Sequence, residues 1–373
     1  MALTHKQEML ATIRGERLSK VPLGVRIDLW YNYNSTRNTL PEKYKGWSEV
    51  EILKDLDVGF EHIFHELVKE DYEGVEVVEE VDGYCTTTKF ITPEGELQRK
   101  MEFNPYEGAH VGYETEKLFK TEKDYPALKY LIAHTVPVSN AEQYKIVSEE
   151  VGENGIIFPT GPTYCPAQYV MRTLIGYERF FYELIDNPQD VEELIELMTI
   201  LERKQYEMIV KTTDLELINV CGNWSDDIHT PVFKKYFIPW FQEITDFLHG
   251  HGRLTRIHID GENRRLFPYF LDTNIDVFEA WSPYPMTKDT TAELRKVLGD
   301  RATIWGGIPS TLFEPAYSDE EFDDYIKNMF KEIAPGDHFI VGMGDNLPFD
   351  GTLERVIRVT ELIEKYGSIP IKI

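Results

Sequence analysis

The stretch LTRIHIDGENRRLFPYFLDTNIDVFEA, residues 254–280, decides the fold of this chain. Residues 254–259 form a short apolar run that is typical of a buried strand, and residues 275–280 form another. Between them, residues 264–271 have a helical pattern. A strand, a helix and a second strand favour parallel pairing, because the helix returns the chain to the edge where the first strand began. The stretch therefore predicts a βαβ unit.

The same alternation continues in both directions from this unit. Further strands are predicted at residues 21–29, 58–64, 155–159, 215–221, 302–305 and 338–341. Helices are predicted at residues 48–56, 141–151, 166–175, 177–185, 232–248, 291–298 and 353–366, and from Asn187-Pro188 and Ser318 onward. Eight strand–helix units close a barrel, so the predicted fold is α/β, a (β/α)8 TIM barrel. An open, doubly wound sheet fits the same pattern.

Residues 75–115 interrupt this regular alternation. Residues 75–81 and 85–91 alternate like paired strands, and Pro93-Glu94-Gly95 is typical of a turn before residues 97–103. We therefore expect a β-hairpin insertion near the N-terminal third of the chain. No low-complexity linker divides the sequence, so residues 1–373 are predicted to form a single domain.

Composition excludes several classes of function. Apolar residues make up 42% of the chain and aromatic residues 13%, enough for a large core. The formal net charge of −26 repels phosphate backbones and anionic lipids, so we expect no nucleic-acid or membrane partner. The N-terminus has no apolar signal core, and a cytoplasmic location is expected. The three cysteines, Cys85, Cys165 and Cys221, form no C-x-x-C pair, which excludes a cysteine-rich zinc site.

Catalytic side chains of such barrels lie where the strands end. His258 and Asp260 are two residues apart and share one face of an extended segment, and Glu279 ends the next strand. An imidazole with carboxylates suits a zinc site with an open position. A hydrogen bond between His258 and Asp260 in a polar interior fits the same residues. Glu243, on the preceding helix, is a further candidate ligand or a surface carboxylate.

Several segments resemble one known family. IHIDG at 257–261, DVFE at 276–279, GGIP at 306–309 and FIVGMGDNLP at 339–348 resemble the C-terminal half of the uroporphyrinogen decarboxylase superfamily. The middle part of these proteins is similar to three segments of this chain: Gly161-Pro162, YERF at 177–180 and Asn187-Pro188. Their N-terminal part is similar to residues 4–22. The resemblance implies a (β/α)8 barrel.

The superfamily contains decarboxylases and corrinoid-linked methyltransferases. The decarboxylases carry Met-Arg-Gln-Ala-Gly-Arg after the first strand, whereas this chain has VRIDLWYN at 25–32, with Arg26 as its one arginine. Methyltransferases of the family often bind zinc through His-x-Cys and a late Cys. Here His258 matches, while Asp260 and Met343 stand at the two cysteine positions. WYNY at 30–33 and LPEKY at 40–44 resemble the O-demethylase methyltransferases.

The resemblance implies a zinc-dependent methyltransferase. Its substrate would be a methoxylated aromatic compound, a phenyl methyl ether, and its acceptor the cobalamin of a separate corrinoid protein. The expected catalytic residues are His258, Asp260 and Glu279, and the expected metal ligands are these three with Glu243. The residues expected to bind the substrate ring or to orient it are Asp28, Tyr31, Tyr33, Asn223, Trp224, Trp281 and Asp345. A homodimer is compatible with the sequence.

Two alternatives remain at this stage. A metal-independent decarboxylase of the uroporphyrinogen decarboxylase type would bind a small or porphyrin-like acid through Arg26 and Arg172. A non-catalytic corrinoid- or tetrapyrrole-binding protein would hold its ligand without turnover. Ring packing in an ordinary core is the alternative for the aromatic residues, and capping of a loop is the alternative for Asn223 and Asp345.

Overall fold

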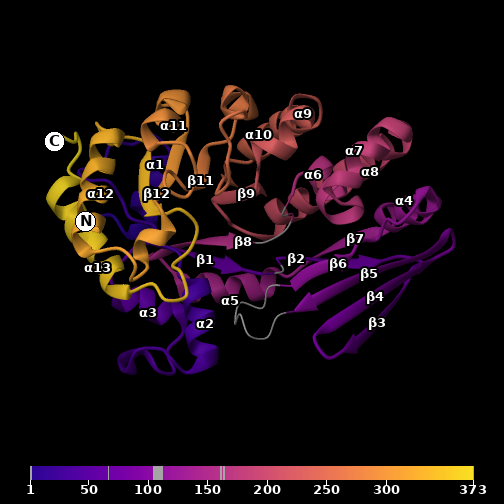
Figure 1. Cartoon of the computed structure of the whole chain (residues 1–373), viewed down its shortest axis with the longest axis horizontal. Helices are drawn as coiled ribbons and strands as arrows, with labels where there is room; N and C mark the ends of the chain where they lie inside the picture. Colours follow the sequence, from indigo (N-terminus) through magenta and orange to yellow (C-terminus); the bar gives the residue numbers. More distant parts are fainter. Residues whose placement is uncertain (1, 66, 104–111, 160–161, 163, 373) are drawn as a thin grey trace. The chain divides into compact units, whose positions relative to one another are not determined.

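The computed structural model describes residues 2–65, 67–103, 112–159, 162 and 164–372 (Figure 1). The chain divides into two compact units. The first, which we call the barrel unit, comprises residues 1–65, 144–159 and 215–373, and the second, the insertion unit, comprises residues 66–143 and 160–214. The single domain predicted over residues 1–373 stays a prediction. Gly161, one of the residues that carry the family resemblance, lies outside the described residues.

The barrel unit contains a five-stranded parallel sheet with the strand order β13-β12-β11-β10-β9. These strands are Leu217–Gly222 (β9), Leu254–His258 (β10), Val277–Trp281 (β11), Thr303–Ile308 (β12) and Phe339–Met343 (β13). Strand β1 (Phe60–Phe64) pairs in parallel with β8 (Gly155–Pro159). Bridges from Leu23 to Val341 and from Val25 to Phe60 join the two sheets.

The resulting series of eight strand segments confirms the predicted (β/α)8 barrel. Closure is incomplete, because no ladder joins β8 to β9 in the described part of the chain. The predicted strand at 21–29 is shorter than expected. Pro22 has no N–H to donate to a ladder, and from Asp28 onward the backbone is helical.

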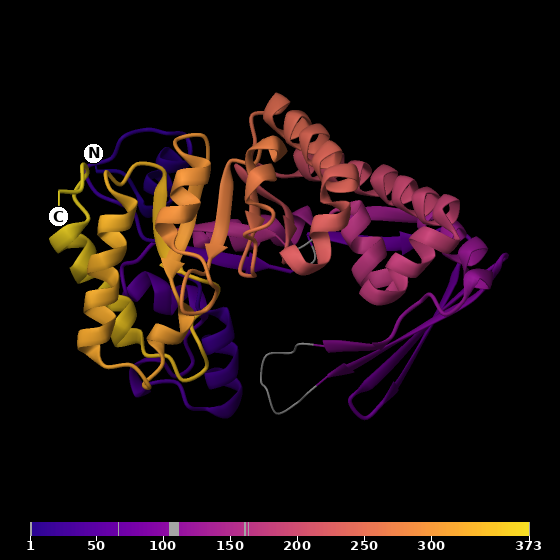
Figure 2. The same ribbon diagram turned by 45° about the horizontal axis from the view of Figure 1, so that its top comes forward.

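Helices cover the outside of the barrel sheet. Helix α10 packs on β10, and both α11 and α12 pack on β12 (Figure 2). The helices and short turns of the unit are α1 (His5–Ile13), α2 (Asp28–Arg37), η1 (Glu42–Tyr44), α3 (Glu49–Asp55), α5 (Ala141–Val151), α9 (Asp226–Val232), η4 (Phe233–Phe237), α10 (Ile238–Gly250), η5 (Phe267–Thr273), α11 (Thr291–Leu298), η6 (Ser310–Phe313), α12 (Asp319–Ile333) and α13 (Leu353–Tyr366). The helix predicted from Ser318 onward begins with a capping box: the Ser318 hydroxyl accepts from Glu321 N, and Ser318 N donates to the Glu321 carboxylate.

The insertion unit carries the predicted hairpin. Strands β3 (Glu76–Asp82), β4 (Cys85–Thr92), β5 (Gly95–Phe103) and β6 (Gly112–Glu116) form an antiparallel sheet in that order. The turn at Pro93-Glu94-Gly95 joins β4 to β5, as expected, and β6 extends the hairpin by a strand. The remaining elements are β2 (Val68–Tyr72), β7 (Thr135–Ser139), η2 (Glu122–Asp124), α4 (Tyr125–Ala133), α6 (Pro166–Tyr169), η3 (Val170–Ile175), α7 (Tyr177–Asp186) and α8 (Pro188–Thr212).

Apolar side chains close the N-terminal end of the barrel interior. They come from helix α1 and from strands of both barrel sheets, and they are Met9, Leu10, Ile13, Ile156, Leu217, Val277, Trp305 and Ile340. Each buried aliphatic side chain of this kind contributes roughly 1.5–3 kcal/mol. This floor leaves the opposite end, where the strands terminate, for polar groups.

In the described part of the chain, no helix is both long enough and apolar enough to span a membrane.

Candidate active site

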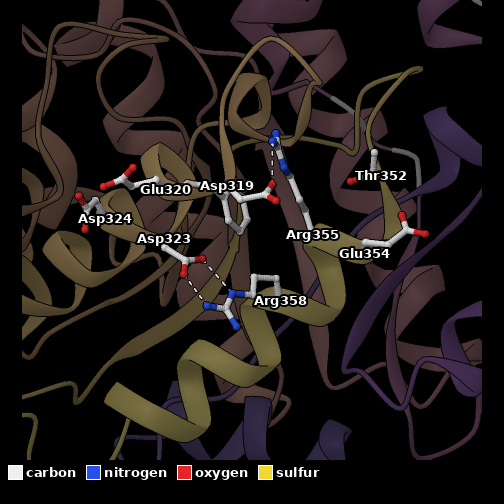
Figure 3. A pocket seen from close by; sticks show the side chains of 9 residues that line it. Asp319, Glu320, Asp323, Asp324, Thr352, Glu354, Arg355 and Arg358 are labelled. Carbon is white, nitrogen blue, oxygen red and sulfur yellow. Dashed lines mark hydrogen bonds and ion pairs between the residues drawn. The ribbon is translucent and has the colours of Figure 1, made fainter.

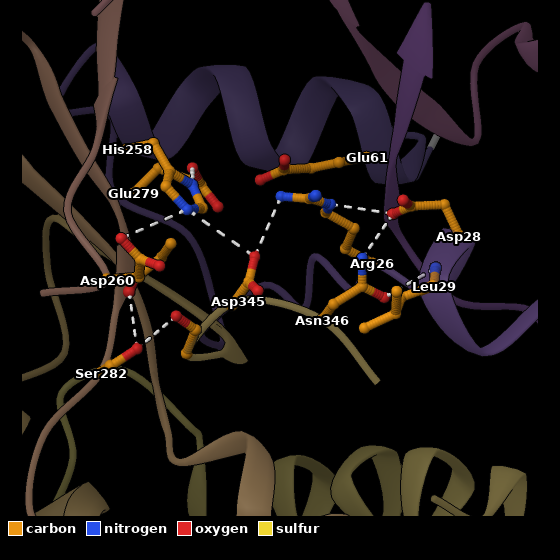
Figure 4. Close-up of polar contacts among 12 residues, drawn as sticks. Arg26, Asp28, Leu29, Glu61, His258, Asp260, Glu279, Ser282, Asp345 and Asn346 are labelled. Carbon is orange, nitrogen blue, oxygen red and sulfur yellow. Dashed lines mark hydrogen bonds and ion pairs between the residues drawn. The ribbon is translucent and has the colours of Figure 1, made fainter. Parts of the chain in front are cut away.

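The candidate site lies at the C-terminal ends of the barrel strands. His258 ends β10 and pairs in register with Glu279 of β11, so the two side chains start from the same level of the sheet. Figure 4 shows these side chains facing a group of acids that includes Asp260 and Asp345. The side chains of His258 and Glu279 are 10% and 3% exposed, so both are removed from bulk water.

The two ring nitrogens of His258 face different partners. Nδ1 lies 2.8 Å from Glu279 Oε2, a hydrogen bond within the barrel. Nε2 lies 3.7 Å from Asp260 Oδ1 and 3.7 Å from Asp345 Oδ1. Because a carboxylate accepts the Nδ1 proton, Nε2 is the nitrogen left to face the two aspartates.

A buried arginine lies directly below this histidine. Arg256, two residues earlier on β10, places Nη2 2.8 Å from Glu279 Oε2 and Nη1 2.9 Å from Glu61 Oε2 of β1. These three side chains are 1–3% exposed. The Arg256 guanidinium also lies over the ring of Phe158, 4.0 Å from its centroid. An ionic layer therefore separates the apolar floor from His258.

A second arginine organises the opposite side of the site. Arg26 donates from Nε to Asp28 Oδ1 at 2.9 Å and from Nη1 to Asp345 Oδ1 at 3.2 Å (Figure 4). Asn346 Nδ2 donates to the same Asp28 oxygen at 2.6 Å, and Leu29 N donates to Asn346 Oδ1. These bonds connect the start of α2 to the loop after β13 and fix the position of Asp345.

Backbone geometry brings the loops of the site close together. Asn223 follows β9 with a φ of 56°, and its N–H donates to the carbonyl of His258 at 3.0 Å. A Cβ on Gly261 would lie 2.6 Å from the carbonyl oxygen of Trp224, so only glycine fits there. The Ser282 hydroxyl bonds the carbonyl of Gly344 and thereby ties the end of β11 to the loop that carries Asp345.

The site carries more negative than positive groups. Its carboxylates belong to Asp28, Glu61, Asp260, Glu279 and Asp345, and its guanidinium groups belong to Arg26 and Arg256. Excess negative charge in a buried cluster favours a further cation, either a proton or a metal ion.

The pKa values of the site follow from burial and from these pairings. Burial acts to lower the pKa of His258, but the charge of Glu279 and the contact with Asp260 outweigh it and raise the pKa to about 10. Burial acts to raise the pKa of Glu279, but Arg256 and His258 lower it to about 2. For Glu61 burial prevails over Arg256, and the pKa rises to about 7. Glu279 is therefore ionised at neutral pH, whereas Glu61 titrates close to neutrality.

The structure brings together some of the predicted site residues. Asp260 and Glu279 contact His258, as the sequence indicates, and Asp345 joins them. Asp28 reaches the group through Arg26. These placements do not test catalytic roles, which stay predictions.

Other predicted residues lie elsewhere. Glu243 is exposed on α10, on the outer side of the barrel sheet, so it does not lie beside His258. Trp224 is 1% exposed and packs edge-on against Phe233 and Phe241. Trp281 is fully buried, and its indole N–H donates to Thr291. Both rings are thus packed in the core, which gives no support for stacking on a substrate.

The aromatic residues of α2 have partners within the barrel unit. The Tyr31 hydroxyl donates to the carbonyl of Trp47. The Tyr33 ring stacks on Phe349 with a centroid distance of 4.5 Å. Their expected contacts with a substrate ring stay predictions.

Sequence reasoning missed Arg256, Glu61 and Asn346. Arg256 and His258 share one face of β10, so their spacing of two is the signal that places an arginine inside the barrel. Glu61 carries a similar signal, since it is the one carboxylate within the short strand β1.

The donor types of the site fit a zinc ion. Imidazole nitrogen and carboxylate oxygen are both zinc ligands, and a histidine held by a carboxylate at its other nitrogen is typical of zinc sites. Within the described residues, however, no group of three or more His, Cys, Asp or Glu already has an arrangement that could hold a metal ion. Binding would require Asp260 and Asp345 to turn toward Nε2.

A separate cavity of about 600 Å³ lies between α12 and α13 (Figure 3). Its arginines already have partners: Arg358 pairs with Asp323, and Arg355 donates to the carbonyls of Leu312 and Glu314. Because one arginine is paired with a carboxylate and the other donates to backbone carbonyls, the cavity has little positive charge left to bind an anionic ligand. It is a weaker candidate for the active site than the strand ends.

Comparison with known proteins agrees with this barrel. The uroporphyrinogen decarboxylase (URO-D) family matches residues 100–366, more than half of the chain. The chain therefore belongs to the uroporphyrinogen decarboxylase family. A methyltransferase from Methanosarcina mazei has a similar fold, with a TM-score of 0.60 and 14% sequence identity over 98% of this chain and 99% of that chain. A search of curated proteins gave no match.

Proposed function

We propose that this enzyme is a methyltransferase that moves a methyl group from a phenyl methyl ether to the cobalamin of a separate corrinoid protein. Family membership supports a methyltransferase or decarboxylase-like activity. The observation that carries the choice is His258, whose Nδ1 is held by a buried carboxylate while Nε2 faces two aspartates. This arrangement suits activation of a leaving group better than it suits recognition of an acid.

In this proposal His258 Nε2, Asp260 and Asp345 would hold a zinc ion, which takes the place of the Nε2 proton of His258 and releases it to solvent. When bound, zinc supplies a Lewis acid that polarises the ether oxygen and stabilises the departing phenolate. Glu279 orients the imidazole ring, and Arg26 with Asp28 holds Asp345. Glu243, exposed on α10, is not part of the proposed ligand set. The negative excess of the cluster supports a cationic occupant.

The decarboxylase alternative has less support. Arg26, the arginine expected to bind a substrate carboxylate, already pairs with Asp28 and Asp345. Arg172, the second one expected, lies over the ring of Tyr164 at 4.7 Å in the insertion unit. An anionic substrate at the strand ends would also meet an excess of carboxylates, which repel it.

Metal content tests the proposal first. Elemental analysis of the purified protein after zinc reconstitution is expected to find about one zinc per chain, because His258 and the aspartates form one set of donors. His258→Ala should lose the metal, whereas His251→Ala, a change at an exposed histidine, should keep it. Zinc retained in His258→Ala at the wild-type ratio would refute the proposed ligand set.

Methyl transfer is tested next. The protein is incubated with a phenyl methyl ether and free cob(I)alamin, and methylcobalamin formation is followed by absorbance. We expect transfer with the wild type and with His251→Ala, and none with His258→Ala. Release of carbon dioxide from a small or porphyrin-like carboxylic acid without any methyl transfer would move the assignment to the decarboxylase alternative.

A further inference from the structure

The buried ionic layer below His258 has no role in the proposed function so far. Arg256 bridges two glutamates that come from different strands, Glu279 of β11 and Glu61 of β1. We propose that Arg256, anchored by Glu61, is a positioning residue that fixes the Glu279 carboxylate and thereby the ring of His258. What Nε2 then does rests on the proposed function, but the orientation of the ring does not.

The geometry at Glu279 supports this role. One oxygen, Oε2, accepts from Arg256 Nη2 and lies at the same distance, 2.8 Å, from His258 Nδ1. A carboxylate with a single donor can rotate and offer either oxygen. Two donors on one oxygen, from consecutive inward positions of the same strand, hold that oxygen in place. The imidazole ring is thereby kept with Nδ1 toward Glu279.

The guanidinium itself has little freedom to move. Glu61 binds Nη1, and the Phe158 and Trp305 rings lie 4.0 and 5.8 Å from the guanidinium carbon. The Trp305 ring is fixed in turn, because its N–H donates to the carbonyl of Gly24 at 3.0 Å. Arg256 thus links His258 to both barrel sheets.

Stability alone does not account for this layer. Removing two or three charged groups from water costs free energy, and apolar residues of similar volume fill such a space as well or better. A buried charge that contacts the carboxylate behind a candidate catalytic histidine is therefore better explained by positioning. The alternative is a purely structural role, in which loss of the pair affects His258 no more than any other loss of core stability.

Hydrogen exchange of the His258 Nδ1 proton distinguishes the two roles. Protein with ring-¹⁵N histidine gives this proton as a protected NMR signal, and the signal is assigned by its absence from His258→Ala. The test variant is Arg256→Met/Glu61→Gln, which removes Arg256 together with its second carboxylate and leaves Glu279 with its hydrogen bond to His258. The control is Ile257→Ala, which weakens the core from the neighbouring, fully buried position on the same strand.

We expect the proton in the double variant to exchange at least about tenfold faster than in Ile257→Ala, because local opening at His258 then precedes global unfolding. Equal exchange rates in the two variants would overturn the proposal. If the double variant does not fold, Glu61→Gln alone removes the anchor of Arg256 and is compared with the same control. The readout needs neither zinc nor substrate, so a wild type without zinc or methyl transfer refutes the proposed function and leaves this inference standing.

Discussion

Replacing Arg256 by methionine tests the ionic layer of the barrel through stability. The substitution keeps most of the side-chain volume but removes the only guanidinium that contacts both Glu61 and Glu279 in the described structure. Those carboxylates are 2% and 3% exposed, so water cannot take the place of the lost cation. In the folded state, the two buried carboxylates then have only His258 and the more distant Arg26 as neighbours of opposite charge, or they must bind protons.

The expected loss is large. Removing one partner of a buried ion pair destabilises by about 3–5 kcal/mol, because it leaves an uncompensated charge. The double variant Arg256→Met/Glu61→Gln should recover more than half of this loss. Arg301→Met, at an exposed arginine, should stay within about 0.5 kcal/mol of the wild type.

The pH dependence has a definite sign. Arg256 lowers the pKa values of both glutamates, so its removal raises both pKa values in the folded state. A carboxyl group whose folded pKa lies above its unfolded value binds more protons when folded, so stability falls as the pH rises from about 4.5 through the folded pKa. The penalty of Arg256→Met is therefore expected to be smaller at pH 5.5 than at pH 7.5.

Urea unfolding followed by circular dichroism at these two pH values measures both quantities. The barrel's transition has to be separated from that of the insertion unit. Tryptophan fluorescence serves as a second probe, because all six tryptophans lie in the barrel unit. A loss below about 1 kcal/mol at pH 7.5, equal at both pH values, would show that the guanidinium is not the partner of these carboxylates.

Three further predictions concern the surroundings of the site. Trp224→Ala should cost about 3–5 kcal/mol by thermal unfolding, because the buried ring packs on three phenylalanines; a change in substrate KM with unaltered stability would instead favour a substrate contact. Gly261→Ala should lower the melting temperature, because its Cβ would meet the Trp224 carbonyl oxygen at 2.6 Å, and an unchanged melting temperature would contradict this. Asp276, 2.8 Å from His249, holds the pKa of that histidine above its usual value, so this pair stabilises the fold below pH 6.5 and loses its effect as the pH rises through the raised pKa. Asp276→Asn should lower the pKa of His249 in an NMR titration, and an unshifted titration would exclude the pair.

Most of the barrel could be predicted from the sequence because its strands are short and apolar and its helices begin with clear signals. Ser318 and Ser48 both form the capping boxes that their sequences indicate. The boundaries were less predictable. The helix expected from residue 232 begins at Asp226 and passes through a π-helical turn, because Pro231 interrupts the regular hydrogen bonding there.

The part of the site that could be predicted consists of residues whose neighbours follow from their position in a strand. His258, Asp260 and Glu279 follow from strand ends and a spacing of two, since adjacent parallel strands place their ends side by side. The position of Glu243 could not be predicted, because a helix residue faces either the sheet or the solvent and a single glutamate does not reveal which. In the structure Glu243 is exposed. Arg26 and Asp345 meet only because residues 23–25 bridge β13 to β1, a pairing that no local pattern announces.

Arg256 shows why the remaining part of the site was missed. In an apolar strand, an arginine at an inward position resembles a solvent-exposed residue until its partners are known. Its partners are one glutamate on the adjacent strand and another on β1, which lies at a distance in the sheet order and contributes its charge across the interior. A lone charge within a predicted buried strand is therefore better treated as one half of a pair. In this barrel, Glu61 is the one carboxylate of β1 and Arg256 the one arginine of β10, and this pair leads to His258, which follows on the same face of β10.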